Sequence, residues 1–256
     1  MAKVSIQTIT VAVDHAPNYG TACKQMCTQI AEAMGLSLVT VITDSTSKYS
    51  AYYCYNNDLR FQVVLFNSSS GLYYELGRQD SSGKISSITS EQFAYIGYDS
   101  ASTYYSSFRL VTAGTLKYIR YLTNSSNYYG FGFATMMNVY DAKTHPIILR
   151  ATSDTLYPSL DVYTMLDDYS VITLSRYKMS DTSIPYDGKF YLVPIRFGSL
   201  TYNIMGSPGE VSYYELMGTS MFGSTMGVNY LPSGTLLSIG GTSVVYIWLY
   251  IFIGLE

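Results

Sequence analysis

The amino-acid sequence predicts a mainly β fold, an antiparallel sandwich or meander of short strands with one N-terminal α-helix. Two observations support this class. Short runs rich in β-branched and aromatic residues recur along the 256-residue chain, separated by turn clusters such as residues 56–58 and 67–71. Apolar residues at clear helical spacing occur over residues 21–34, and everything after them has the pattern of strands.

The N-terminal elements are expected to be a strand, a loop and the helix. Residues 4–13 alternate between apolar and polar, with a slip near Ile9 that indicates a β-bulge. A loop containing Pro17 follows. The helix then covers residues 21–34, and Gly35 is well placed to end it, because glycine readily adopts the left-handed conformation of a helix C-terminus.

Short strands are expected along the rest of the chain. They are predicted at residues 38–43, 49–55, 60–66, 72–76, 93–98, 104–110, 116–122, 131–133, 146–149, 170–177 and 190–197. Residues 159–168 fit either a short helix or a loop. Residues 205–234 are rich in methionine and glycine, which favours either an extended arm that adapts to a neighbour or a long irregular surface loop.

The chain closes with the apolar run 244–253, which is too short to span a bilayer as a helix, since that takes about 20 residues. With the period of a strand, one face is aliphatic and the other carries Tyr246, Trp248 and Tyr250. Both faces need cover, so this run is predicted to be either a central core strand or a strand shared between chains.

These patterns divide the chain into four parts. They are an N-terminal strand-helix-strand segment packed on the sheet (1–55), a sandwich-like body (56–204), the Met/Gly-rich arm or loop (205–234) and a C-terminal hairpin strand (235–256).

Composition and charge narrow the classes of function. Charged residues make up 13% of the chain, about half of the usual quarter. The net charge of −3 and the singly scattered Lys and Arg residues predict no binding to nucleic acid. No signal peptide is recognisable at the start of the sequence, so synthesis in the cytoplasm is expected.

The sequence contains no recognisable catalytic, metal or cofactor motif. The two histidines, His15 and His145, lie beside Asp14 and Pro146 without the nucleophile motif of a hydrolase. The three cysteines (Cys23, Cys27 and Cys54) lack CxxC spacing and are interpreted as small buried hydrophobes, which indicates a reducing compartment during folding. We therefore expect no enzymatic activity, no cofactor and no metal.

One acidic cluster leaves a hydrolase as a remote alternative. It consists of Asp154, Asp161, Asp167 and Asp168. Paired carboxylates can cleave a glycosidic bond, but structural or turn carboxylates are the favoured interpretation of these four residues.

Tyrosine supplies 28 residues and forms five Tyr-Tyr doublets. Adjacent residues of a strand point to opposite faces, so each doublet places rings on both sides of its sheet. Such strands are either covered twice or meet a partner through neutral, rigid contact surface. The interface candidates are therefore Tyr52, Tyr53, Tyr73, Tyr74, Tyr104, Tyr105, Tyr128, Tyr129, Tyr213, Tyr214, Met217, Met221, Met226, Tyr246, Trp248 and Tyr250.

The turn-plus-doublet runs 67–77 and 124–133 and the closing run 234–242 resemble, in style, structural proteins of tailed bacteriophage virions. Such proteins include tail, baseplate, neck and head-decoration components. The resemblance implies a non-enzymatic virion subunit that assembles in several copies with itself and with other virion proteins, in the tail, baseplate or head-tail region. The alternative is a β-sandwich of a phage adsorption apparatus that binds a glycan or receptor, with exposed tyrosine rings making weak contact to sugars.

Overall fold

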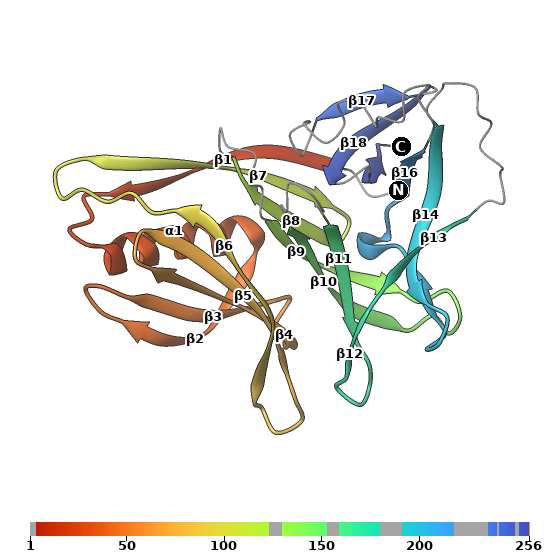
Figure 1. Cartoon of the computed structure of the whole chain (residues 1–256), viewed down its shortest axis with the longest axis horizontal. Helices are drawn as coiled ribbons and strands as arrows, with labels where there is room; N and C mark the ends of the chain where they lie inside the picture. Colours follow the sequence, from red (N-terminus) through yellow and green to blue (C-terminus); the bar gives the residue numbers. More distant parts are fainter. Residues whose placement is uncertain are drawn as a thin grey trace.

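The computed structural model describes residues 4–122, 130–152, 159–179, 191–217, 235–239, 241–248 and 251–255. These residues form three antiparallel β-sheets, one α-helix and one short 3-10 turn, which confirms the predicted mainly β class. Figure 1 shows one sheet lying between the other two, with the helix on the side of the N-terminal strands.

The central sheet combines the first strand with strands from the middle of the chain, in the order β1-β7-β8-β9-β10-β11-β12. Its strands are β1 (Val4–Asp14), β7 (Thr103–Ala113), β8 (Leu116–Tyr121), β9 (Gly130–Met137), β10 (Thr144–Thr152), β11 (Ser159–Met165) and β12 (Val171–Thr173). β1 pairs with β7 along its whole length, from Val4 opposite Ala113 to Asp14 opposite Thr103. This long-range pairing joins the N-terminus to the middle of the sequence.

The N-terminal sheet is a meander in which each strand pairs with the next, in the order β2-β3-β4-β5-β6. Its strands are β2 (Leu36–Asp44), β3 (Tyr49–Tyr55), β4 (Asp58–Ser68), β5 (Gly71–Gln79) and β6 (Ile85–Tyr95). β6 begins earlier than the predicted strand at 93–98. β2 is an edge strand of this sheet.

The C-terminal sheet has the order β13-β14-β16-β19-β18-β17, with β15 also paired to β14. Its elements are β13 (Ser175–Lys178), β14 (Tyr191–Ser199), β15 (Ile204–Gly206), the 3-10 turn η1 (Pro208–Glu210), β16 (Tyr213–Met217), β17 (Leu236–Ile239), β18 (Thr242–Trp248) and β19 (Ile251–Gly254). β17 and β18 form the C-terminal hairpin, with Gly241 at a φ of 84° in its turn.

The helix α1 (Tyr19–Met34) has a capping residue at each end, Asn18 at the N-terminus and Gly35 at the C-terminus. The side chain of Asn18 accepts a hydrogen bond from the Thr21 amide at 2.9 Å. Gly35 ends the helix with a φ of 66°, in the left-handed region. One face of α1 is buried, and it packs against β1 and against strands β2, β3 and β4.

The central sheet is buried on both faces. Along β10, Ile148 belongs to the first core, whereas Ile147 and Leu149 belong to the second. The first core lies between the central sheet, α1 and the N-terminal sheet, and the second lies between the central and C-terminal sheets. A smaller cluster around Tyr246 lies on the other face of the C-terminal sheet. The central sheet is therefore covered on one face by α1 and the N-terminal sheet and on the other face by the C-terminal sheet.

Two local expectations are corrected by strand pairing. Residues 159–165 form β11, paired with β10, and not the expected helix or loop. The terminal run is not one strand but two, β18 and β19, which pair antiparallel. The two predicted faces, one aliphatic and one aromatic, remain separate in the two-stranded arrangement. Val245 lies opposite Ile253 in the second core, and Tyr246 lies opposite Phe252 in the smaller cluster.

The sheets also divide the chain at positions other than the predicted parts. Residues 1–55 contribute β1 to the central sheet but β2 and β3 to the N-terminal sheet. The hairpin of β3 and β4 crosses the expected boundary at residue 55. Within 205–234, η1 and β16 are regular, and residues 218–234 lie outside the described residues.

The doublet at Tyr73 and Tyr74 offers a matched test of the first core. Tyr74 is fully buried, and its ring centroid lies 4.8 Å from that of Phe131. Tyr73 points to the opposite face and stacks on Phe66, with centroids 5.6 Å apart. Tyr74→Ala is expected to lower the free energy of unfolding by about 3–5 kcal/mol. Tyr73→Ala should cost about 1 kcal/mol.

Urea unfolding followed by circular dichroism measures both changes. Equal losses for the two variants would contradict the placement of Tyr74 in the first core.

Candidate assembly surfaces

In the N-terminal sheet the doublets alternate between the core and the outer face, as the strand period requires. Tyr53 and Tyr74 are buried in the first core. The hydroxyls of Tyr49 and Tyr53 lie 3.3 Å apart, within hydrogen-bonding distance. Tyr52 and Tyr73 lie on the opposite face and are partly exposed. One ring of each doublet therefore stabilises the fold, and the other is partly exposed.

In the C-terminal sheet the same alternation buries Tyr213 in the second core, where its hydroxyl donates a hydrogen bond to the Pro208 carbonyl at 2.9 Å. Tyr214 lies on the other face and is partly exposed. Tyr246 is buried against Phe252, with ring centroids 5.5 Å apart. Tyr213 and Tyr246 thus belong to the interior, and Tyr214 is the accessible ring of this group.

The doublet at the start of β7 differs from the others, because both of its rings are exposed. Tyr104 and Tyr105 have exposed fractions of 50% and 67%. They pair with Val13 and Ala12 near the end of β1. The remaining candidates are not placed: Met217 and Trp248 are the last residues of β16 and β18, and Tyr128, Tyr129, Met221, Met226 and Tyr250 lie outside the described residues.

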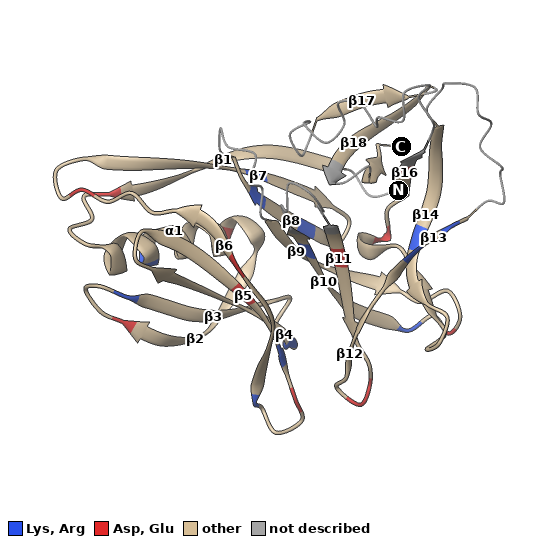
Figure 2. Cartoon of the chain, viewed as in Figure 1, with Lys and Arg blue, Asp and Glu red and all other residues tan. Residues whose placement is uncertain are grey.

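The outer face of the N-terminal sheet is neutral and aromatic. Cross-strand pairing places Tyr52, Val64 and Glu75 in one row, and Phe66 and Tyr73 in the next. These residues carry one charge, that of Glu75. Figure 2 shows the same sparseness over the whole molecule, where charged residues are scattered along the strands. The face resembles the core of a protein interface more than a freely solvated surface.

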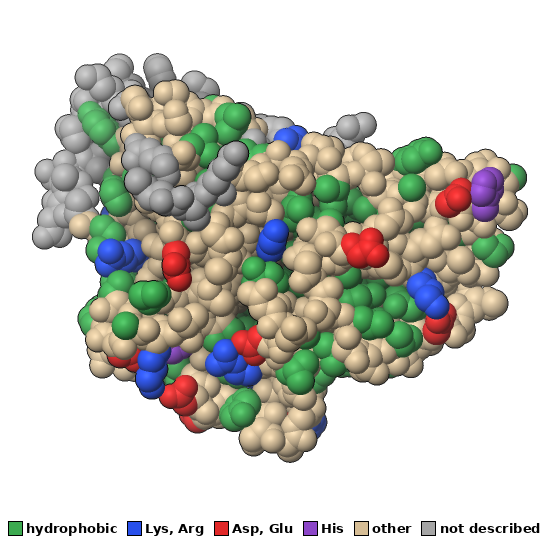
Figure 3. Space-filling view, turned by 180° about the vertical axis from the view of Figure 1, so that it is seen from behind, with side chains coloured by type: hydrophobic (Ala, Val, Ile, Leu, Met, Phe, Trp, Pro, Cys, Tyr) green, Lys and Arg blue, Asp and Glu red, His purple; other side chains and the backbone are tan. Residues whose placement is uncertain are grey.

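The β2 edge continues this face and exposes four apolar side chains. They are Leu38, Val39, Val41 and Ile42, with exposed fractions of 55%, 38%, 42% and 52%. Within the described part of the chain, β2 pairs with β3 on one side, and no strand pairs with its other side. Figure 3 shows hydrophobic side chains exposed on both halves of the molecule, including the half that holds α1 and this sheet.

The β2 edge also lacks the usual protection of an edge strand by charge. Residues 36–43 contain neither a charged residue nor a proline. Two register shifts against β3 make Val39 and Ile42 extra residues, which indicates two β-bulges. Asp44 ends the strand, and its carboxylate lies 2.5 Å from the Lys24 ammonium of α1. This charge is therefore paired within the chain.

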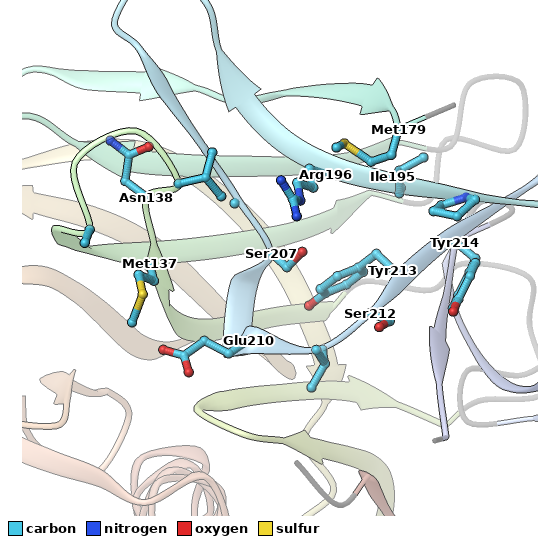
Figure 4. Close-up of a pocket in the computed structure, with 15 residues that line it drawn as sticks. Met137, Asn138, Met179, Ile195, Arg196, Ser207, Glu210, Ser212, Tyr213 and Tyr214 are labelled. Carbon is cyan, nitrogen blue, oxygen red and sulfur yellow. The ribbon is translucent and has the colours of Figure 1, made fainter. Parts of the chain in front are cut away.

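An open cleft of about 570 Å³ lies between the β9–β10 turn and the C-terminal sheet. Figure 4 shows Asn138, Arg196, Glu210 and Tyr214 among its lining residues. Asn138 holds the wall together, because its amide donates to the Asn203 carbonyl at 3.0 Å and its oxygen accepts from the Met205 amide. Glu210 is the single carboxylate among the residues that line this cleft.

Two of the acidic residues of the hydrolase alternative, Asp167 and Asp168, line a second open cleft of about 370 Å³ together with Asp141 and His145, whereas Asp161 lies elsewhere. Asp161 lies 3.5 Å from Arg150, which also pairs with Glu91 of β6. This ion cluster joins the central and N-terminal sheets. Asp167 lies 3.5 Å from Lys143. Asp168 accepts a hydrogen bond from the Ser170 amide at 3.0 Å, which is a turn contact.

Asp154 lies outside the described residues. The three placed carboxylates therefore have separate structural partners. This finding favours the interpretation as structural and turn carboxylates over that of a catalytic pair.

The cysteines and histidines occupy ordinary positions. Cys23, Cys27 and Cys54 are free and buried, as expected of small hydrophobes. His15 is exposed and lies 3.3 Å from Asp14, and His145 is in β10. Across the described residues, no cluster of three or more His, Cys, Asp or Glu could hold a metal ion. In the same residues, no helix has the length and apolar character needed to cross a membrane.

Comparison with known proteins found no matching family model, no similar curated protein and no similar solved structure. The function must therefore be argued from the surfaces described above.

Sequence reasoning missed both the β2 edge and the cleft. The sequence did contain a signal for the edge. A strand over residues 38–42 has apolar residues on both of its faces, and none of these residues is charged. The cleft had no comparable signal, because Asn138, Arg196 and Glu210 come from three separate segments that only the fold brings together.

Because several tyrosines are buried, the free energy of unfolding is expected to fall at alkaline pH. Burial raises the pKa of Tyr53, Tyr74 and Tyr213 above the ordinary value of 10.0. Above pH 10 the unfolded chain releases these protons while the folded chain retains them. The free energy of unfolding is therefore expected to be unaffected by these groups below pH 9 and to fall as the pH rises beyond 10.

Urea unfolding between pH 8 and pH 11.5 measures this dependence, and Tyr213→Phe should make the fall less steep. The prediction fails if all 28 tyrosines ionise in one step while the circular dichroism stays native.

Proposed function

We propose that this protein is a non-enzymatic structural subunit of a viral particle of the tailed-phage type. It assembles in several copies, with itself and with other virion proteins, through neutral β-rich surfaces in the tail, baseplate or head-tail region. The observation that carries the proposal is the apolar β2 edge, which is continuous with the aromatic outer face of the N-terminal sheet.

A sheet edge that is apolar and uncharged is an aggregation hazard for a free monomer. The same edge suits a subunit that is covered in its working state. Rings such as Tyr52 and Tyr73 add contact area at a low cost in side-chain entropy, because a tyrosine has few rotatable bonds. A sparse set of charges makes such contacts weakly dependent on salt.

The layered interior supports the same role. Two cores and the Arg150 ion cluster hold the three sheets together, so the outer surfaces are presented by a well-packed body. Interfaces built on such elements lose less entropy on assembly than interfaces built on loops. Asp161, Asp167 and Asp168 make structural contacts, to Arg150, Lys143 and the Ser170 amide respectively.

The cleft favours a second candidate, a module that binds a glycan or receptor. Its lining combines the ring of Tyr214 with the polar groups of Arg196, Ser207 and Ser212. Aromatic and apolar side chains with a few polar groups are the usual lining of a small-molecule site, and a sugar is one ligand that such a lining could take. On this alternative, the protein would belong to an adsorption apparatus, and Tyr214→Ala would abolish binding to a glycan array.

The two candidates are separated by the abundance and the assembly state of the protein. Mass spectrometry of purified particles should find the structural subunit in stoichiometric amount, and electron microscopy of the purified chain should show a ring, tube or lattice. The proposal fails if the protein is absent from particles. A compact monomer that binds glycans through Tyr214 would establish the second candidate instead.

A further inference from the structure

We propose that two copies of this chain pair through their β2 edges, in an antiparallel contact with a twofold axis at Thr40. The inference deepens the proposed function and rests on it only in part, since it names one contact by which the subunit would assemble. The contact joins the N-terminal sheets of two copies edge to edge.

The β2 edge is chemically symmetric about Thr40. The run from Ser37 to Thr43 reads Ser-Leu-Val-Thr-Val-Ile-Thr. A twofold antiparallel contact centred on Thr40 places each residue opposite the one at the same distance beyond the centre. Leu38 then faces Ile42, Val39 faces Val41, and Ser37 faces Thr43 of the second copy.

Each apolar residue thus meets an apolar residue, and each hydroxyl meets a hydroxyl. An isologous twofold contact requires this kind of self-complementarity, and twofold dimers are the commonest oligomers. The second copy is therefore an occupant that fits without any change of sequence.

The β2 edge carries no charge that would repel a second copy. Two copies of a charged edge would repel each other, but residues 36–43 are uncharged. The nearest charge, that of Asp44, is paired with Lys24 of the same chain. The approach of a second copy along this edge therefore places no unpaired like charges against each other.

The shape of the edge also favours a short contact. Bulges at Val39 and Ile42 interrupt the pairing with β3, and all four apolar side chains of the edge are exposed. Bulges also limit the length of a hydrogen-bonded ladder. The contact is therefore short and centred on Thr40, and burial of the four apolar side chains is its main source of stability.

The first experiment replaces the apolar residues that face each other. Leu38→Glu combined with Ile42→Glu places four carboxylates at the contact. Both side chains are more than half exposed in the subunit, so the fold should tolerate the change. Light scattering after size-exclusion chromatography at about 100 μM is expected to give at least twice the 28.5 kDa chain mass for the wild type and a smaller mass for the variant.

The dissociation constant of the pair is expected to rise at least roughly 100-fold, because unpaired carboxylates would be buried against apolar side chains. Leu200→Glu is the matched control, since Leu200 is 58% exposed in a turn away from β2. It should leave the mass of the wild type unchanged. Thermal unfolding checks that both variants are folded.

The second experiment tests the register. At the axis, Thr40 lies directly opposite Thr40 of the second copy, with Cα atoms about 4.5–5.5 Å apart. That separation allows a disulfide. Thr40→Cys is therefore expected to form a covalent dimer under mild oxidation, while Ser47→Cys, in the exposed turn beyond the strand, is expected to form none. The three native cysteines are buried and do not interfere.

The outcomes separate this inference from the proposed function. A wild type that is monomeric at about 100 μM overturns the β2 pairing, and so does an oligomer that the double Glu variant leaves intact. Neither result contradicts the proposal that the protein is a component of virus particles. Conversely, a chain that dimerises through Thr40→Cys but is absent from purified particles keeps the pairing and refutes the virion role.

Discussion

Burial of the central sheet on both faces is the constraint on which the other elements depend. Successive residues of its strands must both be apolar, as Ile147 and Ile148 are, and each face needs its own cover. The N-terminal sheet and α1 cover one face, and the C-terminal sheet covers the other. The polar residue Arg150 is accommodated on the first-core side of the same strand because Glu91 and Asp161 surround it.

This layering explains the abundance of tyrosine. A buried tyrosine supplies a large ring to a core and a hydroxyl that can serve a backbone carbonyl nearby. Tyr74 donates to the Gly130 carbonyl at 3.4 Å, and Tyr213 donates to that of Pro208. Phenylalanine would fill the same space without these bonds. Tyrosine also leaves a neutral surface where it is exposed, as in Tyr104 and Tyr105.

The two outer layers have different surfaces as a consequence. The outer side of the C-terminal sheet carries its own small cluster around Tyr246, so part of that face is covered within the chain. The N-terminal sheet has no comparable layer among the described residues, and its outer face and β2 edge remain accessible. Assembly through the N-terminal sheet and ligand contact in the cleft would therefore use opposite ends of the molecule (Figure 1).

Local patterns in the sequence were sufficient for the helix at 21–34, its stop at Gly35 and most strands, because these depend on neighbouring residues. They also identified the two faces of the terminal run. The pairing of β1 with β7, the strand at 159–165 and the side of each doublet that is buried were decided only by the tertiary structure. Each of these depends on contacts between segments far apart in the sequence, and a doublet offers a ring to either side with equal chemistry until a second sheet covers one of them.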